Sequence, residues 1–334
     1  MPPPKKKSTA QRAPASNQFP IVAIGASAGG LEAFTQFFIA LPPDTGMAFI
    51  VVAHLDPTHI SLLPELLQKR TGMTVTQVTD NQKIRPDTVY VIPPNKDLSI
   101  LNRVLYLLPP PHSRGLNLPI NSLFHSLAQD LAERAAAIIL SGTGTDGTLG
   151  AKAIKEAGGV VFVQDETSAL YSGMPKSVMA TGLADYTLPP DKMPAQLISY
   201  FRFFQKQVFP ETPAENIRFT DTLPKILVIL RNKTGHDFSL YKQNTLHRRI
   251  ERRLHVHQIE NITDYIQFLQ KSETEASLLF KDLLIGVTSF FRDPEAFEIL
   301  KQQIIPGILA EKTEDSMIRI WIAGCSTGEE VYSI

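Results

Sequence analysis

The stretch FPIVAIGASAGGLEAF, residues 19–34, decides the fold of this 334-residue chain. An apolar run ends at Gly25, a group of small residues that includes Ser27 follows, and two glycines precede a pattern typical of a helix. A buried strand, a tight turn and a helix in this order form the first half of a β–α–β unit. The turn leaves three interpretations of Ser27 open: a nucleophile, part of a nucleotide-binding glycine loop, or a residue that serves only the turn.

The same alternation of strands and helices continues through residues 19–204. Further apolar runs occupy residues 48–53, 75–78, 89–92, 136–140 and 160–163. Several are continuous, which is typical of strands buried on both faces of a parallel sheet. Helical periodicity covers 120–134, while 98–101 and 104–108 predict an antiparallel hairpin at a sheet edge. The predicted fold class is therefore α/β, with a doubly wound, mainly parallel sheet.

Charge and composition exclude several classes of protein. Lys+Arg and Asp+Glu both number 33, so the net charge gives no general case for binding nucleic acid or an anionic membrane. The apolar runs are too short for membrane insertion, and the single cysteine, Cys325, suits a reducing cytoplasm. Residues 1–18 are polar, basic and Pro-rich, which predicts a disordered tail and not a signal peptide.

Chemically capable side chains follow the predicted strands. Ser27 follows the first strand, His54 follows the second, and Asp146 and Asp165 follow two later ones. Because the carboxyl ends of parallel strands share one edge of a sheet, these residues predict a Ser-His-Asp hydrolase, in which the histidine activates the serine and the carboxylate orients the histidine. The residues alone leave Asp56, Asp146 and Asp165 open as the acid, with Asp56 the weakest because it lies only two positions from His54.

The turn motif by itself does not select one enzyme family. Residues 25–29 fit the G-x-S-x-G pattern, but the chain order Ser, His, Asp differs from the Ser, Asp, His order of the hydrolases that carry this elbow. A nucleotide-binding α/β protein is the main alternative, although the loop lacks the Lys-Ser/Thr pair of a Walker loop and the spacing of G-x-G-x-x-G.

The second half of the chain changes character. Residues 205–222 are polar and Pro-containing and predict a linker, and 223–285 predict an all-helical domain. Residues 286–334 contain a predicted strand, 318–323, then a small-residue turn and the start of a helix. A single strand and the start of a helix cannot bury themselves, so we expect residues 286–334 to be the start of an incomplete α/β segment.

Several motifs together resemble the chemotaxis protein-glutamate methylesterase of the CheB type. They include AIGASAGGLEA, VVAHLDP, VYVIPPNKDLSI and IILSGTGTDGTLGAKAIKEAGG, and the match covers residues 19–204. The resemblance implies catalytic roles for Ser27, His54 and Asp146, with Ala28 and Thr143 supporting the oxyanion, and no cofactor for the esterase. It also implies hydrolysis of glutamate γ-methyl esters on cytoplasmic chemoreceptor segments, and it allows histidine-kinase signalling proteins as further partners. A catalytically silent receptor-binding scaffold is the alternative from a different class.

The blocks GVTSFFRDPEAF and RIWIAGCSTGEEVYSI resemble the chemotaxis receptor methyltransferase of the CheR type. This resemblance implies contacts with S-adenosylmethionine at Thr288, Arg292 and Glu329, and a full-length enzyme that both adds and removes methyl groups. It identifies residues 286–334 as the start of an incomplete Rossmann-like methyltransferase domain, which we expect to transfer no methyl group and to bind S-adenosylmethionine weakly.

The segment YKQNTLHRRIERRL resembles the basic helix of the same family. The resemblance implies that Arg248, Arg249, Arg252 and Arg253 dock to an acidic receptor segment. A solvated helix face is the ordinary explanation of such a charge run, and nucleic-acid binding is disfavoured because no aromatic residues interleave.

Overall fold

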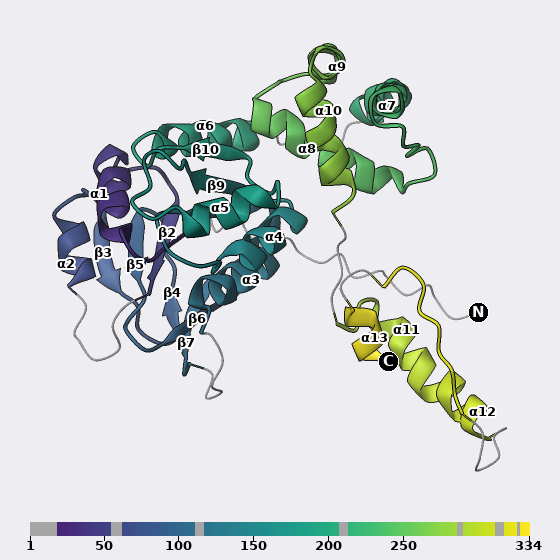
Figure 1. Ribbon diagram of the computed structural model, residues 1–334, viewed down its shortest axis with the longest axis horizontal. Coiled ribbons are helices and arrows are strands. Elements are labelled where there is room, and N and C mark those ends of the chain that lie inside the picture. Colours follow the sequence, from purple (N-terminus) through teal and green to yellow (C-terminus); the bar gives the residue numbers. More distant parts are fainter. Residues whose placement is uncertain are drawn as a thin grey trace, which may run out of the picture. The chain divides into compact units, whose positions relative to one another are not determined.

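The computed structural model describes residues 19–54, 62–110, 117–206, 213–285, 290–310, 317–325 and 328–334. Its centre is a seven-stranded sheet in the order β10-β9-β8-β1-β2-β5-β3, with every pair parallel (Figure 1). The strands are β1 Ile21–Ala26, β2 Ala48–Ala53, β3 Thr74–Gln77, β5 Thr88–Val91, β8 Ala135–Ile139, β9 Val160–Gln164 and β10 Tyr186–Leu188. The predicted α/β class is confirmed.

Helices cover both faces of this sheet. The helices α1 Gly30–Ala40, α2 Leu63–Gln68 and α6 Met193–Lys206 share one core, and α3 Pro119–Leu131, α4 Thr148–Glu156 and α5 Gly173–Ala180 share the other. Successive residues of β1 alternate between the two cores, since Val22 lies with α1 and Ala23 lies with α3. Burial on both faces explains why the strands read as continuous apolar runs.

The predicted hairpin forms, but not at the edge of the main sheet. Strands β6 Asp97–Leu101 and β7 Val104–Leu108 pair antiparallel and belong, with β4 Gln82–Lys83, to a separate three-stranded sheet. Leu98, Ile100 and Leu105 are buried in the same core as the apolar face of α3. The edge placement was wrong because this core, and not a free strand edge, receives the apolar face of the hairpin.

The strand order reverses direction beside β1. From β1 the chain moves to β2 on one side, and later, through α3, to β8 on the other side. Such a reversal opens a crevice at the carboxyl ends of the two central strands, and ligands of open α/β sheets bind in this crevice. The residues that follow β1, β2 and β8 therefore define the part of the molecule in which chemistry is expected.

A helical part follows the sheet and consists of α7 Pro213–Thr234, α8 Gln243–His257, α9 Ile262–Lys271 and α10 Glu273–Leu283. Its core includes Ile226, Ile250, Tyr265 and Leu279. Residues 213–222 of the predicted linker are helical, because they form the first turns of α7. Proline is tolerated in a first helical turn, so Pro213 does not mark a break in the way that the sequence suggested.

The helical part is continuous with the sheet domain in packing. Val256 of α8 is buried in the same core as α1 and α6, and its carbonyl accepts a short hydrogen bond from the hydroxyl of Tyr186 in β10. The described residues up to Leu283 accordingly form one compact unit, and those from Leu284 onward form a second.

The second unit contains α11 Pro294–Ile299, a π-helical turn at Leu300–Ile304, α12 Ile305–Ala310 and α13 Glu329–Ser333. The predicted strand at 318–323 is wrong, since residues 318–322 have no regular secondary structure, Ala323 lies in a turn, and none has a ladder partner among the described residues. The side chains of Ile320 and Trp321 are 62% and 93% exposed. A strand needs a neighbour to pair its backbone, and the described residues supply none here. In the described part of the chain, the helices are all too short or too polar to span a bilayer.

Candidate active site

Ser27 lies immediately after β1, on the rim of the crevice. Its backbone N–H donates to the carbonyl of Ser141, at 2.9 Å, and its own carbonyl accepts from the N–H of Gly30, also at 2.9 Å. Gly29 has φ +73°, and a Cβ there would lie 2.7 Å from the Ser141 hydroxyl. The small residues seen in the sequence thus make a turn that only glycine fits, and this turn holds Ser27 at the strand end.

Three predicted residues meet in one hydrogen-bonded chain. The hydroxyl oxygen of Ser27 lies 3.2 Å from Nδ1 of His54, and Nε2 of His54 lies 2.9 Å from Oδ2 of Asp146. The Asp146 side chain is 2% exposed, whereas that of His54 is 34% exposed. A buried acid therefore supports a histidine that reaches solvent beside the serine, the arrangement that nucleophile activation requires.

The carboxylate of Asp146 is fixed by two helix N-termini. It accepts hydrogen bonds from the backbone N–H groups of Ile120 and Asn121 in the first turn of α3, at 3.1 and 3.0 Å. It also accepts from the N–H of Gly147, which precedes α4, at 2.8 Å. Pro119 opens α3 at a position where the missing N–H costs nothing. Unpaired N–H groups and the helix dipoles both favour a negative charge at this point.

These contacts fix the roles of the two nitrogens of His54. An ionised carboxylate can only accept hydrogen bonds, so Nε2 carries the proton that faces Asp146. Nδ1 then presents its lone pair to the Ser27 hydroxyl. In the serine proteases Nε2 faces the serine and Nδ1 faces the aspartate. In this chain the two nitrogens of His54 exchange these roles.

Asp165 lies outside this chain of contacts. Its carboxylate accepts hydrogen bonds from Thr167 and Ser168 in its own loop, including the Ser168 N–H at 3.0 Å. Partial burial acts to raise the pKa of Asp165, but these hydrogen bonds outweigh it and lower the pKa below its ordinary value. Asp165 therefore organises the β9–α5 loop. Asp56, the remaining alternative, lies outside the described residues.

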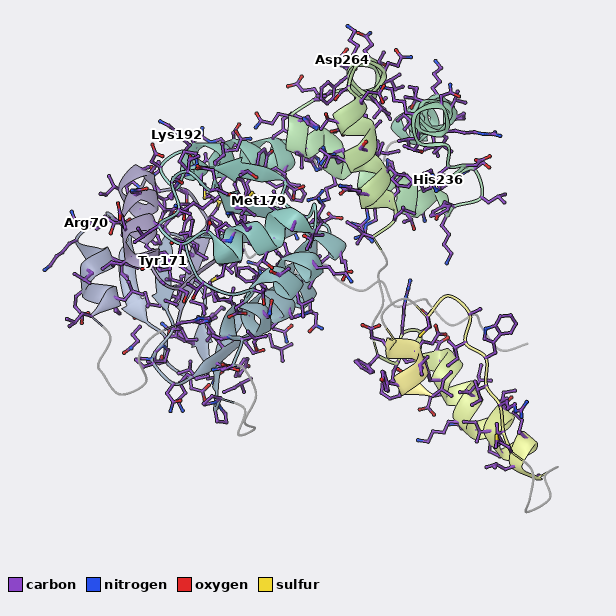
Figure 2. The ribbon with its side chains drawn as sticks, viewed as in Figure 1. Arg70, Tyr171, Met179, Lys192, His236 and Asp264 are labelled. Atoms are coloured by element: carbon purple, nitrogen blue, oxygen red, sulfur yellow. The ribbon has the colours of Figure 1, made fainter. Side chains whose placement is uncertain are left out.

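Ala28 and Thr143, the predicted oxyanion residues, flank Ser27 from two loops. The carbonyl of Ala28 accepts from the hydroxyl of Ser141 at 2.8 Å, and Ser141 is linked in turn to the backbone of Tyr171, labelled in Figure 2. Gly142, which precedes Thr143, passes so close that a Cβ there would lie 3.0 Å from the Cβ of Ser27. Among the described residues, the N–H groups of Ala28 and Thr143 donate no hydrogen bond, so both are available to a ligand.

A cavity of about 240 Å³ opens beside His54. Its lining is formed by Ala53, His54, Ile92, Pro93, Pro94, Asn95, Lys96, Asn117 and Pro119. Lys96 is the single lysine or arginine of this described lining, which contains no carboxylate. Asp97 is buried next to it, and burial, together with the charge of Asp146, raises its pKa, although a hydrogen bond with Asn117 acts in the other direction.

Sequence reasoning did not single out Lys96, Asp97, Asn117 or Asn121. The first two follow β5 in the segment VIPPNKD, and the last two lie at the start of α3. For Lys96 and Asp97, the position after a strand of the sheet is the same signal that identified Ser27 and His54. It was not decisive here, because asparagines and a lysine near prolines are ordinary turn residues.

The basic helix corrects a prediction. Three of its four arginines, Arg249, Arg252 and Arg253, are at most 7% exposed and bonded within the protein. Only Arg248 is exposed, with a loose ion pair of 3.6 Å to Glu133. The prediction of a receptor-docking face made of these four guanidinium groups is therefore wrong. Their partners come from elements distant in the sequence, which the charge run alone could not reveal.

The three predicted cofactor contacts lie in the second unit. Thr288 lies outside the described residues. The N–H of Phe291, next to Arg292, donates to the hydroxyl of Ser333 at 3.0 Å, and this hydroxyl donates to the carbonyl of Glu329. The two predicted motifs are thus held together. Several described apolar side chains of this unit are exposed, Trp321 above all.

Comparison with protein families agrees with this geometry. The family described as CheB methylesterase matches residues 22–197. Residues 221–284 match the all-alpha domain of CheR methyltransferase, and 286–334 match the SAM binding domain of CheR methyltransferase.

Individual relatives cover different shares of the chain. An uncharacterized 104.1 kDa protein of Rhodobacter capsulatus is 36% identical over 81% of this chain and 31% of its own length. A protein-glutamate methylesterase/protein-glutamine glutaminase of Methanosarcina acetivorans is 31% identical over 58% of this chain and 58% of its own length. The chain thus spans less than two thirds of either relative.

A solved structure gives the same result for the sheet domain. The catalytic domain of the CheB methylesterase of Thermotoga maritima superposes with a TM-score of 0.50 at 31% identity, over 54% of this chain and 97% of that domain. The CheB methylesterase match covers more than half of the sequence, and the chain therefore belongs to the CheB methylesterase family.

Proposed function

We propose that residues 19–204 hydrolyse glutamate γ-methyl esters on the cytoplasmic segments of methyl-accepting chemoreceptors. The observation that carries the proposal is the continuous hydrogen-bonded chain from Ser27 through His54 to Asp146. It lies at the strand reversal, where open α/β sheets place their chemistry.

In the proposed reaction, Nδ1 of His54 takes the proton of the Ser27 hydroxyl while the serine oxygen attacks the ester carbonyl. Asp146 stabilises the resulting imidazolium through its hydrogen bond to Nε2. His54 then returns the proton to the departing methoxide, and methanol leaves. Water, deprotonated by His54, cleaves the acyl-enzyme and regenerates Ser27 together with a free glutamate carboxylate.

The tetrahedral intermediates carry a negative charge on the former carbonyl oxygen. The unused N–H groups of Ala28 and Thr143 are the proposed donors to this oxygen, since both belong to loops that adjoin Ser27. Backbone donors keep this role whatever side chains they carry. The proposed ester hydrolysis requires no cofactor.

The cavity beside His54 is the proposed site for the residues that flank the ester. Its prolines and Ile92 offer apolar contact, and Lys96 offers a positive charge. This combination suits a peptide segment that carries carboxylates next to the methylated glutamate.

We assign residues 221–334 to a methyltransferase-like part on the basis of their family matches. Thr288, Arg292 and Glu329 are the proposed contacts to S-adenosylmethionine. The proposal for this part is restricted to binding of the cofactor. Cytoplasmic location and histidine-kinase partners stay predictions.

The test is methanol release from a receptor peptide that carries a glutamate γ-methyl ester, measured with the chain of residues 1–334. Ser27→Ala should lower kcat by a factor on the order of 10⁶, with the fold unchanged by circular dichroism. Turnover of Ser27→Ala within tenfold of the unsubstituted protein would exclude Ser27 as nucleophile. Peptide binding by the unsubstituted protein without methanol release would favour the scaffold alternative, and tight nucleotide binding would favour the nucleotide-binding one.

A further inference from the structure

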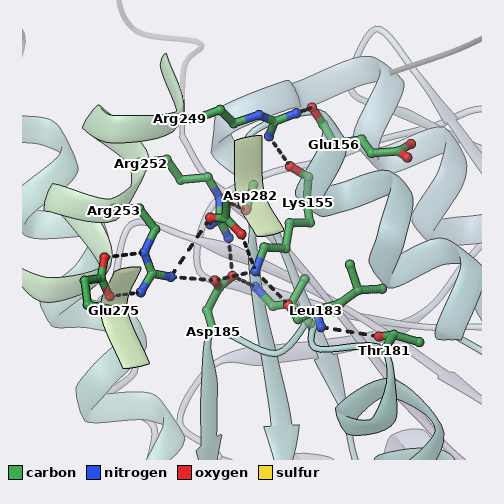
Figure 3. Close-up of polar contacts among 12 residues, drawn as sticks. Lys155, Glu156, Thr181, Leu183, Asp185, Arg249, Arg252, Arg253, Glu275 and Asp282 are labelled. Atoms are coloured by element: carbon green, nitrogen blue, oxygen red, sulfur yellow. Dashed lines mark hydrogen bonds and ion pairs between the residues drawn. The ribbon is translucent and has the colours of Figure 1, made fainter. Parts of the chain in front are cut away.

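A buried cluster of charges joins the sheet domain to the helical part (Figure 3). Lys155 of α4 lies 3.3 Å from Asp185, beside β10, and 3.0 Å from Asp282 of α10. Arg252 of α8 bonds both carboxylates, at 2.8 Å for Asp282 and in a shorter contact for Asp185. The four side chains are at most 3% exposed, so the charges compensate one another away from water.

Two arginines of α8 also hold the backbone at the C-terminal end of α4. Arg249 donates to the carbonyls of Lys155 and Glu156, at 2.9 and 3.2 Å, and Arg252 donates to the carbonyl of Gly159 at 3.1 Å. The last carbonyls of a helix have no partner within the helix, and this end of the dipole attracts cations. The residues after α4 already cap it, since Gly158 and Gly159 donate to the carbonyls of Lys155 and Ile154, and the helical part adds charged donors at the same end.

The opposite end of α4 begins at the active site. Asp146 and Gly147 directly precede the first residue of α4, and the N–H of Gly147 is one of the donors to the Asp146 carboxylate. Asn121 of α3 accepts from the N–H of Gly150 in α4 at 2.8 Å, while its own N–H donates to Asp146. A Cβ on Gly150 would lie 2.5 Å from that of Phe124, so α3 and α4 lie too close to slide independently.

We propose that the helical part, residues 213–283, is a positioning element of the esterase, and that Arg249 and Arg252 act on Asp146 through α4. The nine-residue helix is a rigid connection about 13 Å long. Its C-terminal end is fixed by the two arginines, and its N-terminal end fixes the acid that orients His54. This inference rests on the proposed esterase function and extends it, because it adds to the site two residues that touch neither substrate nor reacting atoms.

Arg249 is the better residue for a test, because its hydrogen bonds to described residues go to carbonyl groups. Arg249→Ala should lower kcat for methanol release on the order of tenfold, since displacement of a catalytic group by a fraction of an ångström weakens turnover. KM should stay within about twofold, because the cavity beside His54 is untouched. Arg249→Lys, which can still donate to a carbonyl, should restore most of the kcat.

Two matched controls separate positioning from a general loss of stability. Arg248→Ala changes the adjacent residue, whose side chain is exposed and only loosely paired with Glu133, and kcat should not change. Tyr265→Phe removes a hydroxyl that donates to Glu275 inside the helical part, at 2.7 Å. It should lower the melting temperature without lowering kcat.

Amide hydrogen exchange gives a second readout that does not depend on turnover. In Arg249→Ala, exchange at Ile120 and Asn121, whose N–H groups bond Asp146, should accelerate, and in Arg248→Ala it should match the unsubstituted protein. Where Arg249→Ala does not fold, Arg249→Gln is the replacement and carries the same expectation.

Unchanged kcat and unchanged exchange in a folded Arg249 variant would overturn the inference, and so would an equal loss of kcat in Tyr265→Phe. An unsubstituted protein that releases no methanol would overturn the esterase proposal instead. The exchange comparison would then still decide whether α8 is coupled to Asp146.

Discussion

Asp146 Oδ2 lies 2.9 Å from Nε2 of His54 and thereby joins the imidazole to the first turns of two helices. The acid is a fixed point of the fold and not a mobile side chain, since three backbone N–H groups bind it and it is almost completely buried. The packing of α3 and α4 therefore sets the orientation of the His54 ring through Asp146.

Asp146→Asn keeps the shape of the acid but changes its hydrogen bonding, since an amide can present N–H to Nε2 and favour the wrong tautomer of His54. We expect kcat for ester hydrolysis to fall by roughly 10⁴. Asp165→Asn is the control, because the Asp165 carboxylate bonds only its own loop among the described residues, and it should retain kcat within a few-fold. A greater loss in Asp165→Asn than in Asp146→Asn would reverse the assignment.

The pH dependence of kcat/KM follows from the role of His54 as a base. Nδ1 can take the proton of Ser27 only when the imidazole is neutral. The rate constant should therefore be low in acid and rise with pH as the imidazole becomes neutral. A profile that stays level from about pH 5 to pH 8 would contradict this role.

Lys96 is expected to act in recognition and not in chemistry. Lys96→Glu should raise KM about fivefold for a methyl-ester peptide with acidic flanking residues and leave kcat unchanged, because an exposed charge pair contributes at most about 1 kcal/mol. A peptide with neutral flanks should show no change. Lys69→Glu is the matched control, an exposed lysine at the end of α2 that does not belong to the cavity lining. An equal rise in KM for Lys96→Glu and Lys69→Glu would show that the net charge of the protein, and not a contact at Lys96, affects peptide binding.

Acid should weaken the fold through the buried carboxylates of the charge cluster. Burial opposes ionisation of Asp185, but Arg252, Lys155 and Arg253 outweigh it and lower its pKa to about 2. Since the unfolded chain titrates near an ordinary pKa of ~4, this stabilisation is complete above that pH and is lost as the pH falls toward about 2.

Glu275 offers the variant that checks this expectation. Burial opposes its ionisation too, but hydrogen bonds with His257 and Arg253 of α8 lower its pKa to about 2. Urea unfolding at about pH 6, 4 and 3 should show a loss on the order of 2 kcal/mol from this carboxylate. Glu275→Gln should be less stable near neutral pH and should lose less on acidification. An identical slope in both proteins would remove Glu275 from the explanation.

The sheet and two members of the triad could be predicted because their signals are local. Continuous apolar runs identify strands buried on both faces, and Ser27 and His54 stand directly at the ends of two of them. Asp146 and Asp165 each follow a strand, so the residues alone could not separate them. Asp146 differs because its carboxylate accepts hydrogen bonds from the N–H groups of Ile120 and Asn121 in α3. These residues are 26 and 25 positions away in the sequence, so no local pattern contains the contact.

The arginines of α8 show the opposite case. Their spacing is that of a solvated helix face, yet Arg252 finds Asp185 at a separation of 67 residues and Asp282 at 30. A charged side chain is buried only where partners converge on it, and this convergence is a property of the tertiary structure. The same limitation explains the wrong strand at 318–323, because pairing depends on neighbours and not on the apolar run itself.

Val256 lies in the apolar interior beneath the sheet although it belongs to α8, beyond the point at which the methylesterase match ends and the methyltransferase match begins. A recombination experiment guided by the family matches would cut the gene between the methylesterase and methyltransferase segments and treat them as interchangeable modules. In this chain that cut would leave a hole in the core that contains Tyr200 and an undercompensated anion at Asp185. The sheet and the helical part thus share a core although their sequences match two families, and a useful graft would have to carry α7 through α10 along with the sheet.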